Sequence, residues 1–437
     1  MKTTLALATL TTLLLTTGLA SAQTSPVPAV KICNANPGWW ESPGLMPAFS
    51  GENGTPQVVD CNFQVWSWTA FVNAMQFDKN TKQPVFLSYP TYDDLKQGGI
   101  AANTRAPRKL TLTPRDQKPK ANGSIEQAGS HGVLVDQNGR AVYYASFMNP
   151  AYFAFTQKYF GSLAYSKAPP TLTYPPGATV FKTSWRILAA GENPAAAYTT
   201  TASIKLLESD GKGGLKTSDK TQDNVPVALT GVHVVGVIRG HPEFAWATFE
   251  QVNNAPDLPD GMQPTSPDPV GQHSFTFYKG GTPANQSNVK PKSMTIDPAT
   301  QVIAPITNVF RQFAYGGATP AYRVTNIQQS NTNFSEGIKE HASRIDPSFS
   351  GYKLIGTVWI QANTLKPGDG NMDQESIGSI DLANSTLETF VQGGGTSCFS
   401  CHNTSAGPGY PGKDINLSHI ILSVLPNNVT KMRMQGQ

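Results

Sequence analysis

Five consecutive residues near the C-terminus, Cys398-Phe399-Ser400-Cys401-His402, form a Cys-x-x-Cys-His motif in a 437-residue chain that has four cysteines. Two cysteines at this spacing can form thioether bonds with the vinyl groups of a haem, and the adjacent histidine can bind the iron. The motif therefore predicts one covalent haem c, attached through Cys398 and Cys401, with His402 as the proximal ligand of the iron.

Two other kinds of site use closely spaced cysteines. A thioredoxin-type redox pair is expected after a strand and at the start of a helix. A zinc site needs a second closely spaced pair of cysteines or histidines, which does not accompany this motif in the sequence. Both stay open as alternatives, and the histidine that directly follows Cys401 favours haem attachment.

The ligand on the other side of the iron is open. Four residues are candidates for it: His419, Met432, Met434 and His241. A methionine would favour a higher reduction potential than a second histidine. Met432 and Met434 lie within six residues of the chain end, where fraying is common. The sixth position could also be open, which would let the iron bind peroxide, oxygen or another small ligand.

Residues outside the motif could serve such an open site. Glu250, or His241 together with Glu243, could act as acid–base groups near bound peroxide. Five tryptophans could line a substrate pocket, although packing in an apolar core explains them more simply. These are Trp66, Trp68, Trp185, Trp246 and Trp359.

The N-terminus has the pattern of an export signal. A lysine at position 2 is followed by an apolar run over residues 5–19 and by Ala20-Ser21-Ala22. This pattern predicts a signal peptide over residues 1–22, cleaved after Ala22, and a periplasmic or secreted protein. No later stretch approaches the ~20 apolar residues of a membrane span, so none is expected after cleavage.

Export also bears on the two remaining cysteines. In an oxidising compartment, Cys33 and Cys61 are expected to form a disulfide. Loop-closure entropy predicts that such a bond stabilises the fold by about 3 kcal/mol. If Cys33 and Cys61 are paired, Cys398 and Cys401 can form a disulfide with each other or attach a haem.

The composition narrows the range of partners. Charged residues make up 14% of the chain and the formal net charge is +4, which argues against nucleic acid or an anionic membrane as partner. A haem carrier would instead exchange electrons with a redox partner protein or with a small-molecule donor or acceptor. The 39 glycines and 34 prolines favour strands and ordered loops over long helices.

We expect residues 23–380 to form a strand-rich α+β body, an antiparallel sandwich or barrel with a few short helices. Alternating apolar, aromatic and β-branched residues predict strands at 132–136, 140–147, 180–188, 228–238, 244–250, 274–278 and 352–362. Apolar residues at helical spacing predict helices at 63–75, 150–160, 302–313 and 334–345.

Residues 78–130 are polar and basic and are expected to form a surface insertion in this body. Six basic residues gather there: Arg105, Arg108, Lys109, Arg115, Lys118 and Lys120. They could dock an acidic redox partner, although a solvated loop explains them more simply.

Residues 381–437 are expected to form a small haem-attachment segment packed on the body. The Ser385-x-x-Glu388 pattern predicts a capped helix that continues to Val391. The three glycines at 393–395 would then end this helix and give a flexible entry to the motif.

The motif, followed by Gly407-Pro408, resembles the start of a c-type cytochrome. In small cytochromes of that family a proline carbonyl orients the proximal imidazole, so the resemblance implies this role for Pro408 toward His402. The position of the motif differs from that family, because only 35 residues follow His402 and a complete small cytochrome domain does not fit there.

The chain as a whole resembles large exported bacterial cytochrome c family proteins that end in a single haem motif. Four segments carry this resemblance in addition to the motif: residues 185–188, 233–235, 246–250 and 382–390. It implies haem attachment and export, and it implies no substrate.

Three functions are compatible with these features. The first is electron transfer by an exported mono-haem c-type cytochrome. The second is a haem-dependent oxidoreductase, peroxidase-like or oxygenase-like, with an open distal site, so whether the protein is an enzyme is left open. The third is a ligand-binding protein in which the haem is an accessory.

Overall fold

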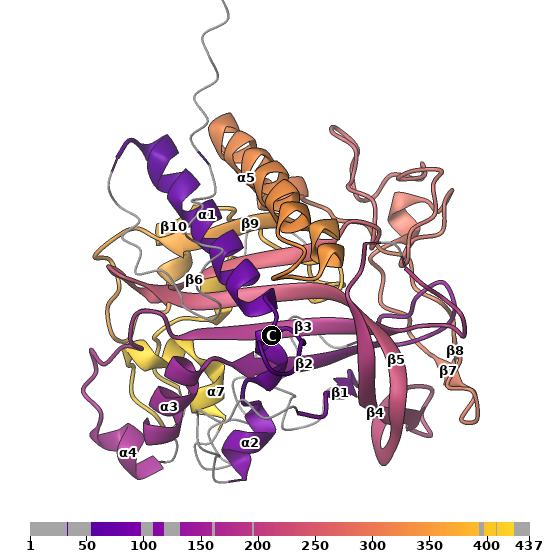
Figure 1. The fold of residues 1–437 in the computed structure, drawn as a ribbon, viewed down its shortest axis with the longest axis horizontal. Coiled ribbons are helices and arrows are strands. Elements are labelled where there is room, and N and C mark those ends of the chain that lie inside the picture. The colour runs from indigo at the N-terminus through magenta and orange to yellow at the C-terminus, as the bar shows by residue number, and fades with distance from the viewer. Residues whose placement is uncertain are drawn as a thin grey trace, which may run out of the picture. The chain divides into compact units, whose positions relative to one another are not determined.

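The computed structural model describes residues 33, 54–97, 108–117, 132–159, 162–194, 196–392, 397–407 and 409–423. Its main feature is an eight-stranded sheet accompanied by helices (Figure 1). The predicted strand-rich α+β class is therefore confirmed. The strands of this sheet are β1 (Thr111–Pro114), β2 (Val142–Met148), β3 (Thr179–Ile187), β4 (Thr199–Ser209), β5 (Leu215–Ile238), β6 (His241–Gln251), β9 (Tyr352–Ile360) and β10 (Ser376–Gly378).

The strand order is β10-β9-β6-β5-β3-β2-β1-β4, with a further pairing between β5 and β4. Every pairing is antiparallel except that of β1 with β4. Because β5 pairs with both β3 and β4, the strands β1 to β5 close into a ring, as in a small barrel. The strands β6, β9 and β10 extend the sheet from the second half of β5.

The 24-residue strand β5 can belong to both parts because its two halves differ in sequence. Its first half is polar and largely exposed where it pairs with β4. Its second half is rich in valine and is buried on both faces between β3 and β6, as β-branched residues favour. The strand predicted at 228–238 is thus confirmed, and only its polar beginning was missed.

One face of the sheet is covered by two helices, α1 (Pro56–Met75) and α5 (Ala321–Glu340), which contact each other and β9 (Figure 1). The α1 helix has apolar residues on all of its sides, so most of its surface is buried. Within this layer Trp68 stacks on Phe334 at a ring-centroid distance of 5.3 Å and meets Phe249 of β6 at 4.8 Å. The helix predicted at 63–75 is confirmed, with its first residue at Pro56.

The other face carries the C-terminal residues. Neighbouring residues of a strand point to opposite faces, and Val235 and Phe244 pack in a second apolar cluster with Phe399 and Ile421. The helices on this face are α3 (Pro150–Tyr159), α4 (Ser162–Lys167), α6 (Cys398–Cys401) and α7 (His419–Leu422), with the 3₁₀ turn η7 (Asp414–Leu417). The α3 and α7 helices lie side by side (Figure 1).

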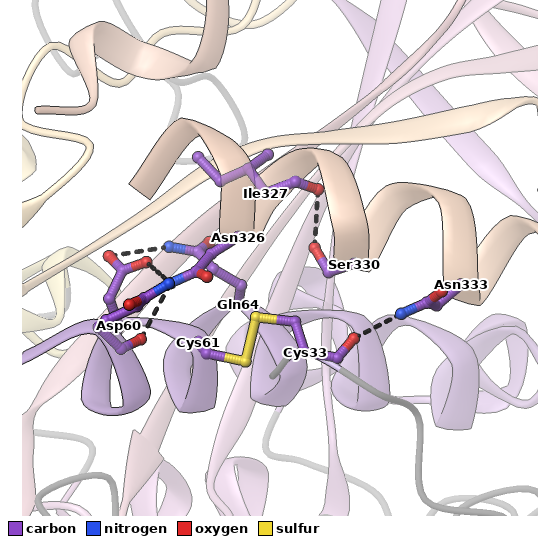
Figure 2. The surroundings of a disulfide bond; sticks show 9 residues. Cys33, Asp60, Cys61, Gln64, Asn326, Ile327, Ser330 and Asn333 are labelled. Atoms are coloured by element: carbon purple, nitrogen blue, oxygen red, sulfur yellow. Dashed lines mark hydrogen bonds between the residues drawn. A yellow bond between two sulfur atoms is a disulfide. The ribbon is translucent and has the colours of Figure 1, made fainter. Parts of the chain in front are cut away.

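The disulfide between Cys33 and Cys61 is present, with 5.4 Å between the two Cα atoms, as predicted. It joins Cys33 to α1, and Asn333 of α5 donates to the Cys33 carbonyl at 2.7 Å (Figure 2). In the same layer Asn326 donates to the Asp60 carboxylate at 2.8 Å. The disulfide therefore fixes Cys33 at the contact between α1 and α5.

The described parts of residues 78–130 differ from the predicted surface insertion. They contain the 3₁₀ turn η2 (Val85–Ser88), the helix α2 (Tyr92–Lys96) and the sheet strand β1. Phe86 and Leu112 are fully buried. Short apolar groups within a polar sequence supply these buried side chains, and their alternation was too brief to be recognised.

Four predicted elements of the body differ from the structure. Residues 132–136 form no strand and make only an isolated bridge, between Val135 and Ala141. Residues 302–313 contain no helix but the short strand β8 (Ile303–Ala304), which pairs with β7 (Thr295–Ile296). Residues 274–278 form a turn closed by Phe275 and Tyr278 rather than a strand. The helix predicted at 334–345 is the second half of α5, whose polar first half lacks an apolar stripe. The remaining 3₁₀ turns are η3 (Ala284–Gln286), η4 (Ala314–Gly317), η5 (Pro347–Gly351) and η6 (Met372–Glu375).

Among the residues that the structure describes, no helix combines the length and apolar character needed to cross a membrane.

Candidate functional site

The segment that leads to the Cys-x-x-Cys-His motif lies across the sheet. Asn384 donates to the hydroxyl of Thr248 on β6 at 2.8 Å, and the hydroxyls of Thr386 and Ser184 on β3 are 2.7 Å apart. A Cβ atom at Gly231 on β5 would come within 2.6 Å of the Thr386 hydroxyl. The glycine therefore permits this close crossing.

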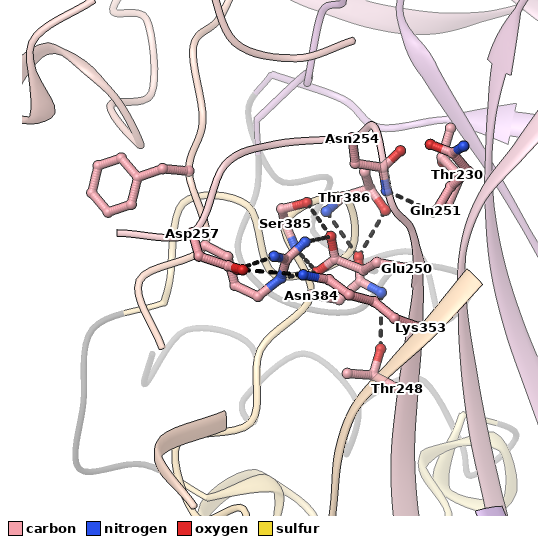
Figure 3. Close-up of polar contacts among 12 residues, drawn as sticks. Thr230, Thr248, Glu250, Gln251, Asn254, Asp257, Lys353, Asn384, Ser385 and Thr386 are labelled. Atoms are coloured by element: carbon pink, nitrogen blue, oxygen red, sulfur yellow. Dashed lines mark hydrogen bonds and ion pairs between the residues drawn. The ribbon is translucent and has the colours of Figure 1, made fainter. Parts of the chain in front are cut away.

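A buried ionic cluster holds this crossing in place (Figure 3). The Glu250 carboxylate accepts hydrogen bonds from the backbone N–H and the hydroxyl of Ser385, at 2.7 and 2.6 Å. Arg311 donates to the same carboxylate at 2.6 Å and also pairs with Asp257. Lys353 completes the cluster through Asp257, at 3.1 Å.

The environment of Glu250 gives it a structural role rather than the acid–base role considered from the sequence. Burial by itself raises the pKa of this carboxyl, but Arg311 and Ser385 outweigh burial and hold its pKa below the ordinary value. A carboxylate that stays ionised and saturated with donors is a poor proton donor. Glu250 therefore anchors the segment before the motif.

This anchoring also explains why residues 385–391 form turns instead of the predicted helix. The Ser385 hydroxyl donates to Glu250 and so does not cap a helix. Glu388 reaches back one residue further than a capping box requires, accepting from the backbone N–H of Asn384 at 2.8 Å, because the N–H of Ser385 donates to Glu250. The serine of the predicted cap is therefore bonded to Glu250, which lies far away in the sequence, instead of to the backbone of a local helix.

The motif itself begins with α6, a single helical turn. The Ser397 hydroxyl accepts from the backbone N–H of Phe399 at 3.2 Å and caps this turn. Phe399 is fully buried and meets Trp246 of β6 edge-on, at a centroid distance of 6.3 Å. One buried aromatic residue thus fixes the turn to the sheet and leaves Cys398 partly exposed and Cys401 exposed.

The two motif cysteines are not joined by a disulfide. Burial raises the pKa of the Cys398 thiol, and the nearby charges of Glu388 and Cys401 raise it further. The attacking cysteine of a thioredoxin-type pair needs a lowered pKa. This environment argues against that alternative and leaves two thiols, one turn apart, on the same helical face.

His402 is held on three sides. Its Nδ1 lies 3.0 Å from the carbonyl oxygen of Leu417. A carbonyl can only accept, so Nδ1 carries the proton and the lone pair lies on Nε2, which is the form that binds a metal. Trp246 lies against one face of the imidazole, at 4.2 Å between centroids and 42° between planes. His419 stacks on the ring at 4.0 Å and 21°.

A buried amide fixes the carbonyl that His402 contacts. The Asn416 side chain donates to the carbonyls of Ser405 and Pro411, at 3.1 and 3.0 Å, and accepts from the Tyr165 hydroxyl at 2.5 Å. It therefore closes the loop that ends at Leu417. The role implied for Pro408 falls on a residue outside the described part of the chain.

The predicted candidates for the second iron ligand are not brought together with His402. His241 is fully buried and meets Phe63 of α1 at 4.9 Å, on the face of the sheet that α1 covers. Met432 and Met434 lie outside the described residues. His419 is adjacent to His402, but the two rings face each other, whereas a metal binds in the plane of an imidazole. As placed, these two histidines do not oppose each other across a metal.

The His241–Glu243 pair suggested as an acid–base couple is likewise part of the α1 side. His241 Nδ1 lies 2.8 Å from the Glu243 carboxylate, and both side chains are buried. Burial raises the pKa of Glu243 despite the contact with His241. The pair is therefore separated from the motif by the sheet.

Another histidine–carboxylate pair does lie on the motif face. His233 of β5 lies 2.8 Å from Glu388 through Nε2, and its neighbour across the sheet is Thr248. Its position two residues from Val235, the partner of Trp246, puts it on the same face as Trp246. The charge of Glu388 also adds to the effect of burial in raising the pKa of the Cys398 thiol.

The three described members of the predicted basic docking cluster are paired with carboxylates or buried. Arg108 pairs with Asp94, and Lys109 pairs with Asp223. Arg115 is buried over the ring of Tyr144, at 4.4 Å, and donates to a backbone carbonyl. The other three members lie outside the described residues. Within the described ranges, no group of three histidine, cysteine or acidic residues is arranged to hold a metal ion.

No family model, curated protein or solved structure matches this chain.

The sequence identified the motif but not its supports. The alternation over 244–250 predicted that Phe244 and Trp246 share a face, although nothing indicated that this face meets His402. The Leu417 carbonyl and the Asn416 amide had no recognisable signal, because a backbone acceptor carries no side-chain identity and asparagine is common in loops.

Proposed function

We propose that this protein is an exported mono-haem c-type cytochrome that transfers electrons through a haem attached to Cys398 and Cys401, with His402 as the proximal iron ligand. One observation carries the proposal. The two thiols lie one helical turn apart without a disulfide, and the next residue is a histidine whose Nδ1 meets the Leu417 carbonyl. This is the donor set and the tautomer that a covalent haem requires.

Each residue of the proposed haem site would have its own role. Cys398 and Cys401 would hold the haem, His402 would bind its iron, and Trp246 would lie beside that ligand. The haem, when bound, supplies an iron that changes its charge by one electron. The exposure of Cys401 would leave that end of the motif accessible from solvent, where a redox partner protein or a small-molecule donor or acceptor can approach.

The proposal includes export. The N-terminal residues 1–22 have the pattern of a cleaved signal peptide, which is consistent with a periplasmic or secreted protein. The disulfide between Cys33 and Cys61 is compatible with an oxidising compartment.

The proposal can be tested by removing the attachment points. In cells that carry the bacterial haem-attachment machinery, we expect the double variant Cys398→Ala/Cys401→Ala to lose all haem stain on a denaturing gel. The matched control is Ser400→Ala, which changes the same helical turn but keeps both cysteines and the histidine. It removes the 3.9 Å contact of the Ser400 hydroxyl with the Cys401 sulfur and is expected to keep the stain. Haem stain that survives in the double variant would show that these cysteines do not attach it.

A haem-dependent oxidoreductase with an open distal site is the second candidate. The observation that favours it is the placement of two candidate ligands, since His241 lies on the α1 face and His419 stacks on His402 rather than opposing it. A high-spin spectrum that shifts with cyanide or peroxide would support this candidate. A low-spin spectrum that ignores both ligands would support electron transfer.

A further inference from the structure

The imidazole of His402 is enclosed by two aromatic rings that come from different parts of the fold. Trp246 belongs to the sheet strand β6 and approaches one face at 4.2 Å. His419 is the first residue of α7 and stacks nearly parallel to the same imidazole at 4.0 Å. Contacts at these distances restrict rotation of the ring about its Cβ–Cγ bond, because either face would collide with a neighbour.

His419 makes a second contact that ties it to the motif. Its Nε2 lies 3.2 Å from the carbonyl oxygen of Cys401, and a carbonyl can only accept, so this nitrogen carries a proton and donates it. A protonated nitrogen has no lone pair for a metal. The nitrogen that a distal ligand would most often use is therefore engaged with the residue next to His402.

The Nδ1 edge of His402 is also occupied, by the Leu417 carbonyl at 3.0 Å. The ring of His419 faces this imidazole with 21° between the two planes, so it does not lie in the plane in which an imidazole nitrogen binds a metal.

We infer that Trp246 and His419 are positioning residues that clamp the proximal imidazole, and that His419 is not the ligand on the opposite side of the iron. The inference rests on the proposed haem site and assigns new roles within it. The clamp fixes the plane of the imidazole, and His419 also holds the end of the motif helix against α7.

The first test uses haem-free protein, so that it does not depend on attachment. The Cys398→Ala/Cys401→Ala variant, labelled with ¹⁵N in its histidine rings, is compared by NMR with the same protein carrying His419→Ala or Trp246→Ala. We expect both substitutions to shift the ring signals of His402, because each removes a ring current at about 4 Å. The matched control, His273→Phe, changes an exposed histidine and should leave them in place.

The second test uses the haem-loaded full chain with His419→Phe, His419→Ala and Trp246→Ala. The phenylalanine keeps a flat ring but cannot bind iron, so its ferric spectrum should keep the wild-type spin state. The two alanine variants should keep their haem but show broadened and shifted ferric EPR signals, because the imidazole plane is no longer fixed.

The outcomes separate the two claims. A change from low spin to high spin in His419→Phe would make His419 the distal ligand and overturn the clamp. His402 ring signals that do not move in either alanine variant of the haem-free protein would overturn it as well. Wild-type protein without covalent haem would refute the proposed function, and the NMR comparison would still decide whether the two rings hold His402.

Discussion

At the scale of single residues, the two motif cysteines differ although only two residues separate them. Cys398 is half-buried against the apolar cluster that contains Phe399, and burial raises the pKa of its thiol, whereas Cys401 is exposed. The thiolate is the reactive form of cysteine, so the raised pKa of Cys398 lowers its reactivity. The two thiols should therefore be distinguishable by their rates of alkylation.

We predict that iodoacetamide labels Cys401 at least about tenfold faster than Cys398 at pH 8 in haem-free protein, since one unit of pKa changes the thiolate fraction about tenfold. Mass spectrometry of the labelled peptide measures both rates. Glu388→Gln should accelerate Cys398 by removing one of the charges that raise its pKa, but should leave it slower than Cys401, because burial is the larger cause. Equal rates for the two cysteines would contradict this account.

The types and spacing of the motif residues were enough to predict a chemical role for them, whereas residue type alone was not enough elsewhere. Cys398, Cys401 and His402 were recognised because their spacing carries a chemistry, and the structure leaves both thiols out of any disulfide. Glu250 and His241 were reasonable acid–base candidates by type. Their roles could not be read from the sequence, because they depend on Arg311 and Phe63, which the fold brings from far along the chain.

At the scale of elements, the end of β6 and the segment before the motif are joined by buried charge. Glu250 links Arg311 to both donors of Ser385. Removing one partner of a buried pair leaves an unpaired charge in an apolar environment, which is far more costly than an exposed ion pair. This contact should therefore govern how firmly the motif is fixed to the sheet.

We predict that Arg311→Met lowers the free energy of unfolding at pH 7 by about 3–5 kcal/mol, the usual cost of a broken buried pair. The double variant Arg311→Met/Glu250→Gln should recover part of this loss, because its glutamine carries no charge. Urea unfolding followed by circular dichroism measures both values. A single variant that loses less than the double variant would contradict the predicted coupling.

The same pair gives a pH dependence with a defined sign. The pKa of Glu250 is lowered in the folded protein, so its stabilising effect is present above the unfolded pKa and is lost as the pH falls through the folded value. In Arg311→Met, the buried carboxyl can instead take up a proton as the pH falls. The difference in stability between wild type and this variant should therefore shrink from pH 7 toward pH 4.

The elements also show which predictions sequence patterns support. The β2, β3, β6 and β9 strands were predicted because valine, aromatic and small residues dominate them. The beginning of β5 and of α5 was missed, because both are polar and their positions are set by β4 and by α1. The capping pattern at Ser385 predicted a helix that does not form. The Ser385 hydroxyl donates to Glu250, and the local sequence gives no sign of this distant partner.

At the scale of the whole molecule, the described C-terminal residues cover one face of the sheet. They belong to the same compact unit as the strands beneath them. Phe399, Ile415 and Ile421 pack in the same cluster as Phe244 and Ile360. The sequence predicted a body at 23–380 and a separate haem-attachment segment at 381–437. The described part of that segment covers an apolar face of the sheet.

We predict that a chain ending at residue 380 does not unfold cooperatively and is recovered as aggregate. The truncation uncovers apolar side chains on β6 and β9, each of which contributes about 1.5–3 kcal/mol when buried. It also removes Ser385 from the Glu250 cluster. Losses from several such residues approach the 5–15 kcal/mol that typically separates folded from unfolded domains.

The matched control for this truncation is a chain ending at residue 423, which keeps every contact described on this face of the sheet. Solubility after export and differential scanning calorimetry compare the two chains with the full-length protein. The longer chain should melt in one transition close to that of the full-length protein. A cooperative transition at nearly the same temperature in the chain ending at 380 would show that the strands are stable alone, and that the residues after 380 are an appendage instead of part of the core.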